Sequence, residues 1–553
     1  MAKLGLIFLG IFLGILDVLY PSPAEDHTAD GPVVDTMYGP IKGVYLEQGS
    51  MFLGVPFAAP PVGSLRWQPP QPPSKWGPKT YNATAPSAAC IQQECGPDDA
   101  DTIGQCPPSR KKSEDCLYLN VFVPFKTDKS KLPVIFWIHG GNFWGGSAMG
   151  PLYDGRFLAN KTKTVVVAAN YRLSALGFLV AGQGEGAATG NFGILDQIAA
   201  LQWIQDNIAE FGGDKDRVTI FGQSAGAYSV VLHMTVNKSD HLFHRAIAAS
   251  PPLSLTFRSR VGAIIYGDEF SRQLNCTLGD MRCLRAASAS QVSKAQYAVR
   301  TKIVNPFDLI ELFEPWGPTV DGDLVRGQVV DAFENGMFQK KPLIIGSTTE
   351  EAIAFVYETG QILSTLEYEA AVYGLFLTEG SAVLRQYPPS HSGDERPIDS
   401  VLVTHYLFPC PARYAIRNAA KHNDTDLWLY VFAHPLSFKH VWGNFTHCEG
   451  HVCHGTDVVF AFQSQTLRGY HFTADEQVLA DSMAYYYGNF AHTGDPNKPA
   501  SRLTKQASSD PPRWPPYLSS ENYTNIRFNT PNSLEQGYLQ EKCDFWDSIS
   551  PYP

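Results

Sequence analysis

The 553-residue chain has no block of basic residues, no internal repeat and no low-complexity linker. Its excess of acidic residues gives a net charge of -11, which argues against nucleic acid or an anionic membrane as a partner. Beyond the N-terminus, no apolar run is long enough to span a bilayer. Because proline and glycine punctuate the whole chain and mark no single boundary, we expect one domain over residues 25–553.

The N-terminal residues have the layout of a secretory signal peptide. One lysine precedes an apolar run from Leu4 to Leu16, and a helix-breaking Pro21 and small residues follow, so we expect cleavage after Ala24. The apolar run is shorter than the ~20 residues of a membrane-spanning helix, which disfavours the alternative of an uncleaved anchor. The sequence therefore predicts a secreted protein with a signal peptide at residues 1–24 and no stable membrane anchor.

Secretion decides how the cysteines are interpreted, since an even set in an oxidising compartment is expected to form disulfides. The ten cysteines are Cys90, Cys95, Cys106, Cys116, Cys276, Cys283, Cys410, Cys448, Cys453 and Cys543. Asn-x-Ser/Thr sequons without an intervening proline are spread along the chain and fit a glycosylated exterior. Their asparagines are Asn82, Asn160, Asn237, Asn275, Asn423, Asn444 and Asn522.

Continuous apolar runs, as opposed to alternating ones, predict buried β-strands that need cover on both faces. They lie at residues 132–141, 163–171, 217–222, 341–347 and 426–434. One helix is predicted because apolar residues recur at spacings of four and three and form one buried stripe: Ile194, Ile198, Leu201, Ile204 and Ile208. We expect it to end at Gly212-Gly213, where a left-handed residue is needed. A second helix is expected from about Glu476 to Phe490. Strands that alternate with helices predict a mostly parallel, twisted α/β sheet with helices on both faces.

The sequence GQSAG, residues 222–226, follows one of these strands and precedes an apolar segment. Gly222 and Gly226 allow a tight strand-to-helix turn in which Ser224 takes a strained conformation and its Oγ projects from the sheet edge. The alternative, a turn serine without function, is disfavoured by this placement. Ser224 is therefore a candidate nucleophile.

An attack by Ser224 on a carbonyl group would create an oxyanion, which requires preorganised backbone N–H donors. We expect one donor at Ala225, at the start of the following helix. The others are expected in the turn HGGNFWGG, residues 139–146, which directly follows a predicted strand. An ordinary Gly-rich loop is the alternative interpretation of this turn.

Several segments together resemble the type-B carboxylesterase and cholinesterase family. They are SEDCLYLNVFVP (113–124), the HGGNF turn, NYRLSALGFL (170–179), GNFGILDQIAALQWIQDNIAEFGGD (190–214) and GQSAG. The resemblance extends from about residue 30 to 546. It implies an α/β-hydrolase fold, a Ser-His-Glu triad, a small-molecule ester substrate and no cofactor.

The resemblance also implies roles for individual residues. Gly141, Asn142 and Ala225 would be the oxyanion donors, with Asn142 where many members have a third Gly or an Ala. The implied disulfides are Cys90 with Cys116, Cys276 with Cys283, and Cys410 with Cys543. Arg66 with Glu114 and Arg172 with Asp196 resemble two ion pairs that support the fold in this family, so we assign them to architecture.

The acid and the base of the triad follow from the same resemblance. The family places its glutamate five residues after a strand-end glycine, and counting from Gly346 gives Glu351. Glu350 stays an alternative, since the glycine that usually follows the glutamate is an alanine here. The family pattern His-Gly-x-Asp/Glu matches HGTD at residues 454–457, so His454 is the expected base.

The segment THCEGHVCHGTD, residues 446–457, also contains side chains of the types that bind zinc. Elimination leaves Cys448 to pair with Cys453, and Cys95 with Cys106. An oxidised pair cannot supply the thiolates that zinc requires, so we expect a catalytic loop closed by a disulfide and no metal site.

The sequence therefore predicts a secreted serine hydrolase that cleaves carboxylic esters through an acyl-enzyme intermediate. A catalytically silent adhesion or scaffold protein is the alternative of a different class, and the presence of all three triad residues disfavours it. A lipase would have a large apolar lid, whereas the loop from Cys90 to Cys116 is rich in Gly, Asp, Lys and Pro. Cholinesterases of this family carry a tryptophan ten residues before the cysteine that closes this loop, where this chain has Cys106.

Overall fold

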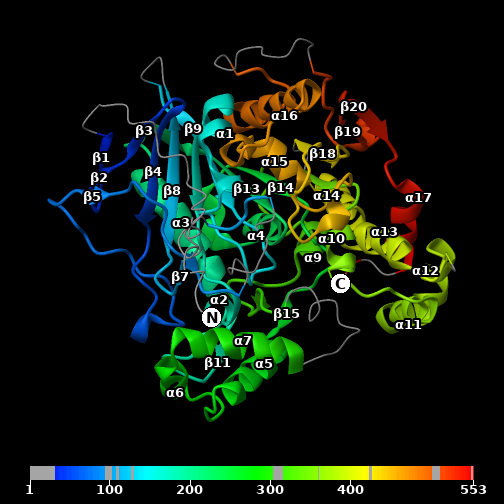
Figure 1. The fold of residues 1–553 in the computed structure, drawn as a ribbon, viewed down its shortest axis with the longest axis horizontal. Helices are drawn as coiled ribbons and strands as arrows, with labels where there is room; N and C mark the ends of the chain where they lie inside the picture. Colours follow the sequence, from blue (N-terminus) through cyan, green and yellow to red (C-terminus); the bar gives the residue numbers. More distant parts are fainter. Residues whose placement is uncertain are drawn as a thin grey trace, which may run out of the picture. The chain divides into compact units, whose positions relative to one another are not determined.

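A large mixed β-sheet forms the centre of the computed structural model (Figure 1). The structure describes residues 31–93, 103–107, 111–125, 130–302, 315–358, 360–390, 392–422, 426–500, 511–549 and 552. The predicted signal peptide, Cys95 and Asn423 lie outside these residues. Within them the sheet has eleven strands, in the order β20 (Ser533–Gln536), β19 (Thr524–Phe528), β18 (Leu427–Phe432), β17 (Leu343–Thr348), β14 (Arg245–Ala249), β13 (Gly213–Gln223), β9 (Leu132–Ile138), β10 (Val165–Ala169), β8 (Tyr118–Pro124), β4 (Gly49–Pro56) and β3 (Val44–Leu46).

The central strands, from β19 to β10 in this order, run parallel to one another. The antiparallel pairs lie at the two ends of the sheet. All five predicted strand segments are found among the central strands, and the predicted mostly parallel sheet is confirmed. Its carboxyl edge brings together the ends of β9, β13, β17 and β18, which lie far apart in the sequence.

The continuous apolar runs arise because both faces of the sheet are buried. In β9, Val134 and Phe136 contribute to one hydrophobic cluster and Ile135 and Trp137 to another. The first cluster also contains residues of α3 (Phe192–Asn207), α4 (Ala225–His233) and α14 (Pro409–His422). The second contains residues of α1 (Arg156–Thr162), α15 (Thr456–Phe462) and α16 (Ala474–Thr493), and Figure 1 shows α15 beside α16. Helices therefore cover both faces, as predicted.

The two predicted helices differ in how well their ends were predicted. The predicted helix at 476–490 is α16, which begins with a capping box between Thr473 and Glu476. The other, α3, ends at Asn207, before the predicted Gly212-Gly213. After Asn207 the N–H groups of residues 210–212 bond to carbonyls three residues back, so the chain tightens into turns, and Gly213 begins β13.

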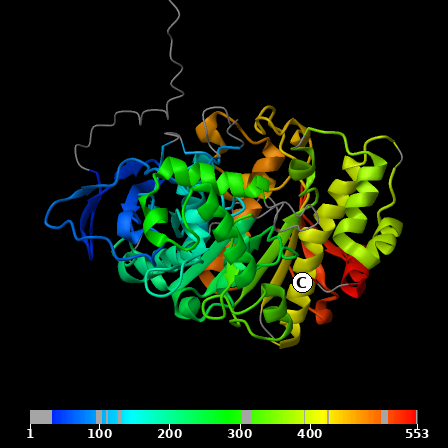
Figure 2. The same cartoon turned by 90° about the horizontal axis from the view of Figure 1, so that it is seen from below.

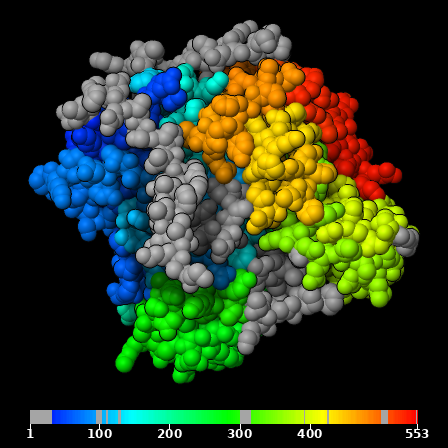
Figure 3. All heavy atoms as spheres, viewed as in Figure 1, coloured from blue at the N-terminus to red at the C-terminus, as the bar shows by residue number. Residues whose placement is uncertain are grey.

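A third hydrophobic cluster lies below the sheet as Figure 1 shows it. It packs α2 (Ser174–Phe178), α5 (Arg260–Gln273) and α7 (Ala289–Lys302) around the buried rings of Trp67 and Trp316. Seen from below, these helices lie in front of part of the sheet (Figure 2). In the space-filling view the green segment, which includes α5, occupies the lower part of the face (Figure 3). The sequence analysis did not predict these helices.

Disulfides close short loops of the chain and also join segments that are distant in the sequence. The structure has disulfides between Cys90 and Cys116, Cys276 and Cys283, Cys410 and Cys543, and Cys448 and Cys453. Cys106 is also disulfide-bonded, and no free cysteine occurs among the described residues.

None of the helices in the described part of the chain has both the length and the apolar character needed to cross a membrane.

Candidate active site

Ser224 lies in a sharp turn between β13 and α4, at the carboxyl edge of the sheet. Its backbone has φ 58° and ψ -128°, a strained conformation for a residue other than glycine. A Cβ atom on Gly222 would lie 2.4 Å from the carbonyl oxygen of Gly226, and one on Gly226 would lie 2.0 Å from that of Ile138. Both glycines are therefore required by close backbone contacts, which is the turn that GQSAG predicts.

The turn after β9 lies directly against Ser224. β9 pairs with β13, and a Cβ atom on Gly140 would lie 2.9 Å from the Cβ of Ser224. In the part of the chain that the structure describes, the backbone N–H groups of Gly141, Asn142 and Ala225 donate to no protein acceptor. Unpaired backbone donors in the two turns that meet at Ser224 are the kind of group that an oxyanion hole requires.

His139 fixes the start of this turn from within the core. The His139 ring stacks on Tyr171, and its Nδ1 lies 2.8 Å from the carbonyl oxygen of Gly140. The Tyr171 hydroxyl donates to the His139 carbonyl oxygen at 2.9 Å. Burial lowers the pKa of His139 to about 4, so the ring stays neutral and adds no charge to this turn.

His454 and Glu351 form a close pair near the nucleophile. Nδ1 of His454 lies 2.5 Å from Oε2 of Glu351, and the Thr348 N–H donates to the other oxygen of this carboxylate at 2.6 Å. The Glu351 side chain is fully buried and the His454 side chain is 10% exposed. Such a carboxylate fixes the tautomer and orientation of the imidazole and would stabilise its charged form.

The opposite side of the imidazole contacts Gln223, a residue that the sequence analysis did not single out. Nε2 of His454 lies 2.9 Å from Nε2 of the Gln223 carboxamide. Two aromatic rings, Phe355 and Phe408, flank His454 with centroids 5.1 Å away. Only the position of Gln223 beside the candidate nucleophile could have pointed to this residue.

Glu350 contacts the same loop as Glu351 but not the base. Its carboxylate accepts the Val452 N–H at 2.7 Å and lies 2.8 Å from Nδ1 of His451. The adjacent Cys453 is bonded to Cys448, so neither sulfur is a free thiolate. The described residues contain no group of three or more His, Cys, Asp or Glu side chains that could hold a metal ion. The histidines of this loop other than His454 thus have structural neighbours.

Asp457 is a second buried carboxyl group, close enough to His454 and Glu351 to interact with both. Burial raises the pKa of Asp457 to about 6, against the effect of the Tyr430 hydroxyl, which donates to its Oδ2 at 2.7 Å. Glu351 contributes to the higher pKa and His454 opposes it. Asp457 is thus held closer to its neutral form than an exposed aspartate would be.

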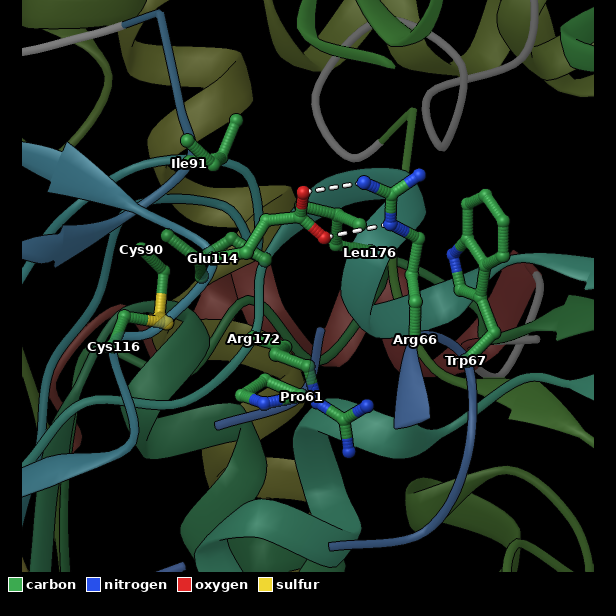
Figure 4. Close-up of a pocket in the computed structure, with 10 residues that line it drawn as sticks. Pro61, Arg66, Trp67, Cys90, Ile91, Glu114, Cys116, Arg172 and Leu176 are labelled. Carbon is green, nitrogen blue, oxygen red and sulfur yellow. Dashed lines mark hydrogen bonds and ion pairs between the residues drawn. A yellow bond between two sulfur atoms is a disulfide. The ribbon is translucent and has the colours of Figure 1, made fainter. Parts of the chain in front are cut away.

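Two hollows lie away from Ser224. A cavity of about 10 Å³ lies beside the Arg66–Glu114 ion pair and the Cys90–Cys116 disulfide, and has room for about one water molecule (Figure 4). The second, of about 880 Å³, is lined by residues that follow α4, including Met234, and by residues of and around α9 (Val329–Glu334). Figure 4 shows the guanidinium of Arg66 facing the carboxylate of Glu114, and neither hollow includes a candidate catalytic residue.

The two predicted ion pairs are confirmed as architecture. Arg66 donates to both oxygens of Glu114, at 2.7 and 2.5 Å, and to the carbonyl oxygen of Ala287 at 2.6 Å. Arg172 and Asp196 are almost fully buried and form three hydrogen bonds of 2.7 to 3.0 Å. Both pairs hold segments that are distant in the sequence, and neither touches the candidate site.

The sheet, its helices and the strand-turn-helix at Ser224 define an α/β-hydrolase. The model of the carboxylesterase family matches residues 30–546, and the chain belongs to this family. The crystal protein of Dictyostelium discoideum is 36% identical over 521 residues, which cover 93% of this chain and 90% of that protein. The cAMP-regulated D2 protein of the same organism is 34% identical over 546 residues, covering 98% and 97%. Acetylcholinesterase 1 of Caenorhabditis elegans is 32% identical over 548 residues, covering 90% and 84%.

Proposed function

We propose that the protein is a serine hydrolase that cleaves small carboxylic esters through an acyl-enzyme intermediate. Ser224 is the nucleophile, His454 the general base and Glu351 the carboxylate that orients the base. The proposal depends above all on one observation. The imidazole of His454 contacts Glu351 at 2.5 Å through Nδ1, and its Nε2 contacts the residue that precedes Ser224.

The reaction follows from these positions. Oγ of Ser224 attacks the ester carbonyl carbon while its proton moves to Nε2 of His454 and the carbonyl π electrons move onto oxygen. The oxyanion accepts hydrogen bonds from the N–H groups of Gly141, Asn142 and Ala225. Its collapse breaks the bond to the alcohol oxygen, which takes the proton from Nε2. Water then repeats the sequence on the acyl-enzyme and releases the carboxylic acid.

We also propose that residues 1–24 are removed as a signal peptide and that residues 25–553 are secreted as one glycosylated domain. The disulfides support an oxidising compartment. Of the predicted glycosylation sites in the described residues, Asn160 is half-buried. The others are exposed: Asn82, Asn237, Asn275, Asn444 and Asn522.

Replacement of the nucleophile tests the proposed reaction. Ser224→Ala should lower kcat for a p-nitrophenyl ester on the order of 10⁴- to 10⁶-fold. Peptide mass spectrometry after treatment with an organophosphate should place the adduct on Ser224. Ser250→Ala is a matched control, because Ser250 also follows a strand, has φ 55° and is buried, yet its hydroxyl has no partner among the described residues.

The control variant should keep its activity and its single adduct on Ser224. A Ser224→Ala protein that hydrolyses the ester at the wild-type rate would refute the assignment, as would an adduct on another residue. A folded wild-type protein that neither reacts with the organophosphate nor turns over any ester of a chain-length series would favour the catalytically silent alternative.

A further inference from the structure

The contact between Gln223 and His454 defines the state of the base. A carboxamide nitrogen only donates hydrogen bonds, so Nε2 of His454, 2.9 Å away, accepts with its lone pair. The imidazole proton is then on Nδ1, which donates to Glu351. Among the described residues, Oγ of Ser224 has no hydrogen-bond partner. The lone pair that must receive the serine proton is thus already occupied.

Packing places the Gln223 side chain between the two halves of the site. Gln223 is 4% exposed. Its Oε1 lies 2.9 Å from the position of a Cβ atom on Gly140, and its Nε2 lies 3.7 Å from that of a Cβ atom on Gly455. The carboxamide therefore lies between the turn at residues 139–146 and the loop that carries His454.

We propose that Gln223 caps the base: in the substrate-free protein its carboxamide occupies Nε2 of His454, and the bound ester must displace it before Ser224 can be deprotonated. This inference rests on the proposed function. Once the proton is on Nε2, a half-turn of the carboxamide presents Oε1 to the new N–H. A neutral side chain with one donor and one acceptor end can partner both protonation states of the base.

The neutrality of Gln223 matters because the base already faces two carboxyl groups. Among the described residues, the carboxyl groups that interact with the His454 ring are Glu351 and Asp457, and the flanking rings of Phe355 and Phe408 carry no charge. A carboxylate at position 223 accepts a hydrogen bond only from protonated Nε2. It would therefore favour the charged form of the base, so that the lone pair needed by Ser224 becomes available only at higher pH.

Removal of the cap gives the sharpest test. Gln223→Met keeps the length of the side chain but has no N–H donor, so the lone pair of His454 becomes free for Ser224. We expect the second-order rate constant for organophosphate labelling, measured above the acid limb of the pH profile, to rise roughly threefold to tenfold. A role limited to packing predicts slower labelling. A Gln223→Met protein that unfolds like the wild type and labels no faster overturns the proposal.

A charged replacement tests the same contact through pH. Gln223→Glu should move the acid limb of the kcat/KM profile to higher pH by about one unit, a tenfold loss of rate on that limb. Gln202→Glu adds the same charge at an exposed position of α3 and should leave the limb in place. No movement in Gln223→Glu, or an equal movement in both variants, contradicts the cap.

A measurement on the wild-type protein keeps the test independent of whether the variants fold. With ¹⁵N in glutamine side chains and histidine rings, the cap predicts a scalar coupling across the hydrogen bond between the Gln223 carboxamide nitrogen and Nε2 of His454. Its absence at a pH where the ring is neutral overturns the inference. Failure of the proposed function looks different, since either Ser224→Ala would remain active or the wild-type protein would turn over no ester, whatever the outcome at Gln223.

Discussion

Acid should destabilise the protein through His233, the last residue of α4. Nε2 of His233 lies 2.9 Å from Oε1 of Gln197, whose amide donates to Oγ of Ser229 at 3.1 Å. Ser229 in turn donates to the carbonyl oxygen of Ala225 at 3.0 Å, beside the proposed nucleophile. Burial lowers the pKa of His233 from 6.5 to about 3, so the folded protein holds this ring neutral.

The size of the effect follows from proton linkage. Between pH 6.5 and about 3 the unfolded chain binds a proton at His233 that the folded protein excludes, so stability is lost as the pH falls below 6.5. Each pH unit in this window costs about 1.4 kcal/mol. Between pH 7.5 and 4.5 this histidine should therefore remove about 2.7 kcal/mol from the free energy of unfolding.

Other buried groups contribute to the same curve with both signs. Burial lowers the pKa of His139 and of His405 to about 4, which also costs stability in acid. Burial raises the pKa of Asp399 and of Asp457 to about 6, and these groups stabilise the folded protein as the pH falls through that value. The total slope therefore does not isolate His233, but the difference between wild type and a His233 variant does.

His233→Gln keeps a donor for Gln197 and removes the titration. Denaturant titrations at pH 7.5 and 4.5 should show that this variant loses about 2.7 kcal/mol less stability than the wild type over that range. His241→Gln, at an exposed position shortly after α4, is the control and should follow the wild type. Parallel stability curves for wild type and His233→Gln would refute the reasoning, whatever the offset between them.

Two predictions concern the proposed reaction itself. Glu350→Ala should lower kcat roughly tenfold to a hundredfold by loosening the base loop, whereas Glu350→Gln, which keeps an acceptor for the Val452 N–H, should retain most activity. An equal loss of several orders of magnitude in both would make Glu350 the triad acid. Butyrylcholine and its neutral isostere 3,3-dimethylbutyl butyrate should have similar kcat/KM values, since Cys106 stands where cholinesterases carry a tryptophan. A tenfold preference for the charged ester, about 1.4 kcal/mol, would contradict this.

The fold was predictable where local composition and burial agree. The apolar runs at 132–141 and 426–434 predicted strands because both faces of the sheet are covered. β14, Arg245–Ala249, was missed because it is short and rich in alanine, which has no strong strand preference. β13 extends back to Gly213 through polar residues that no apolar pattern reveals, with an irregularity between Gly213 and Val218.

The residues of the candidate site also differ in how far the sequence alone predicts them. Ser224 and its two glycines are a local motif, so five consecutive letters and a preceding strand were enough to predict the turn. The contact of Gln223 with His454 joins residues 231 positions apart, and no spacing rule connects them. The choice between Glu350 and Glu351 also depends on tertiary contacts, because both follow β17 and only the structure shows which carboxylate lies against which histidine.

The loop between β18 and α15 has to hold a base although it contains little regular structure. A free segment of this length would sample many conformations, and each would misplace the imidazole. The loop is instead fixed directly before His454 by the Cys448–Cys453 disulfide and by Glu350, and at His454 by Glu351. Because Glu350 and Glu351 are consecutive on one turn, the part of the chain that orients the base also restrains the loop that carries it. The conformational freedom of the loop is thus reduced at His454, where the proposed chemistry needs a precise position.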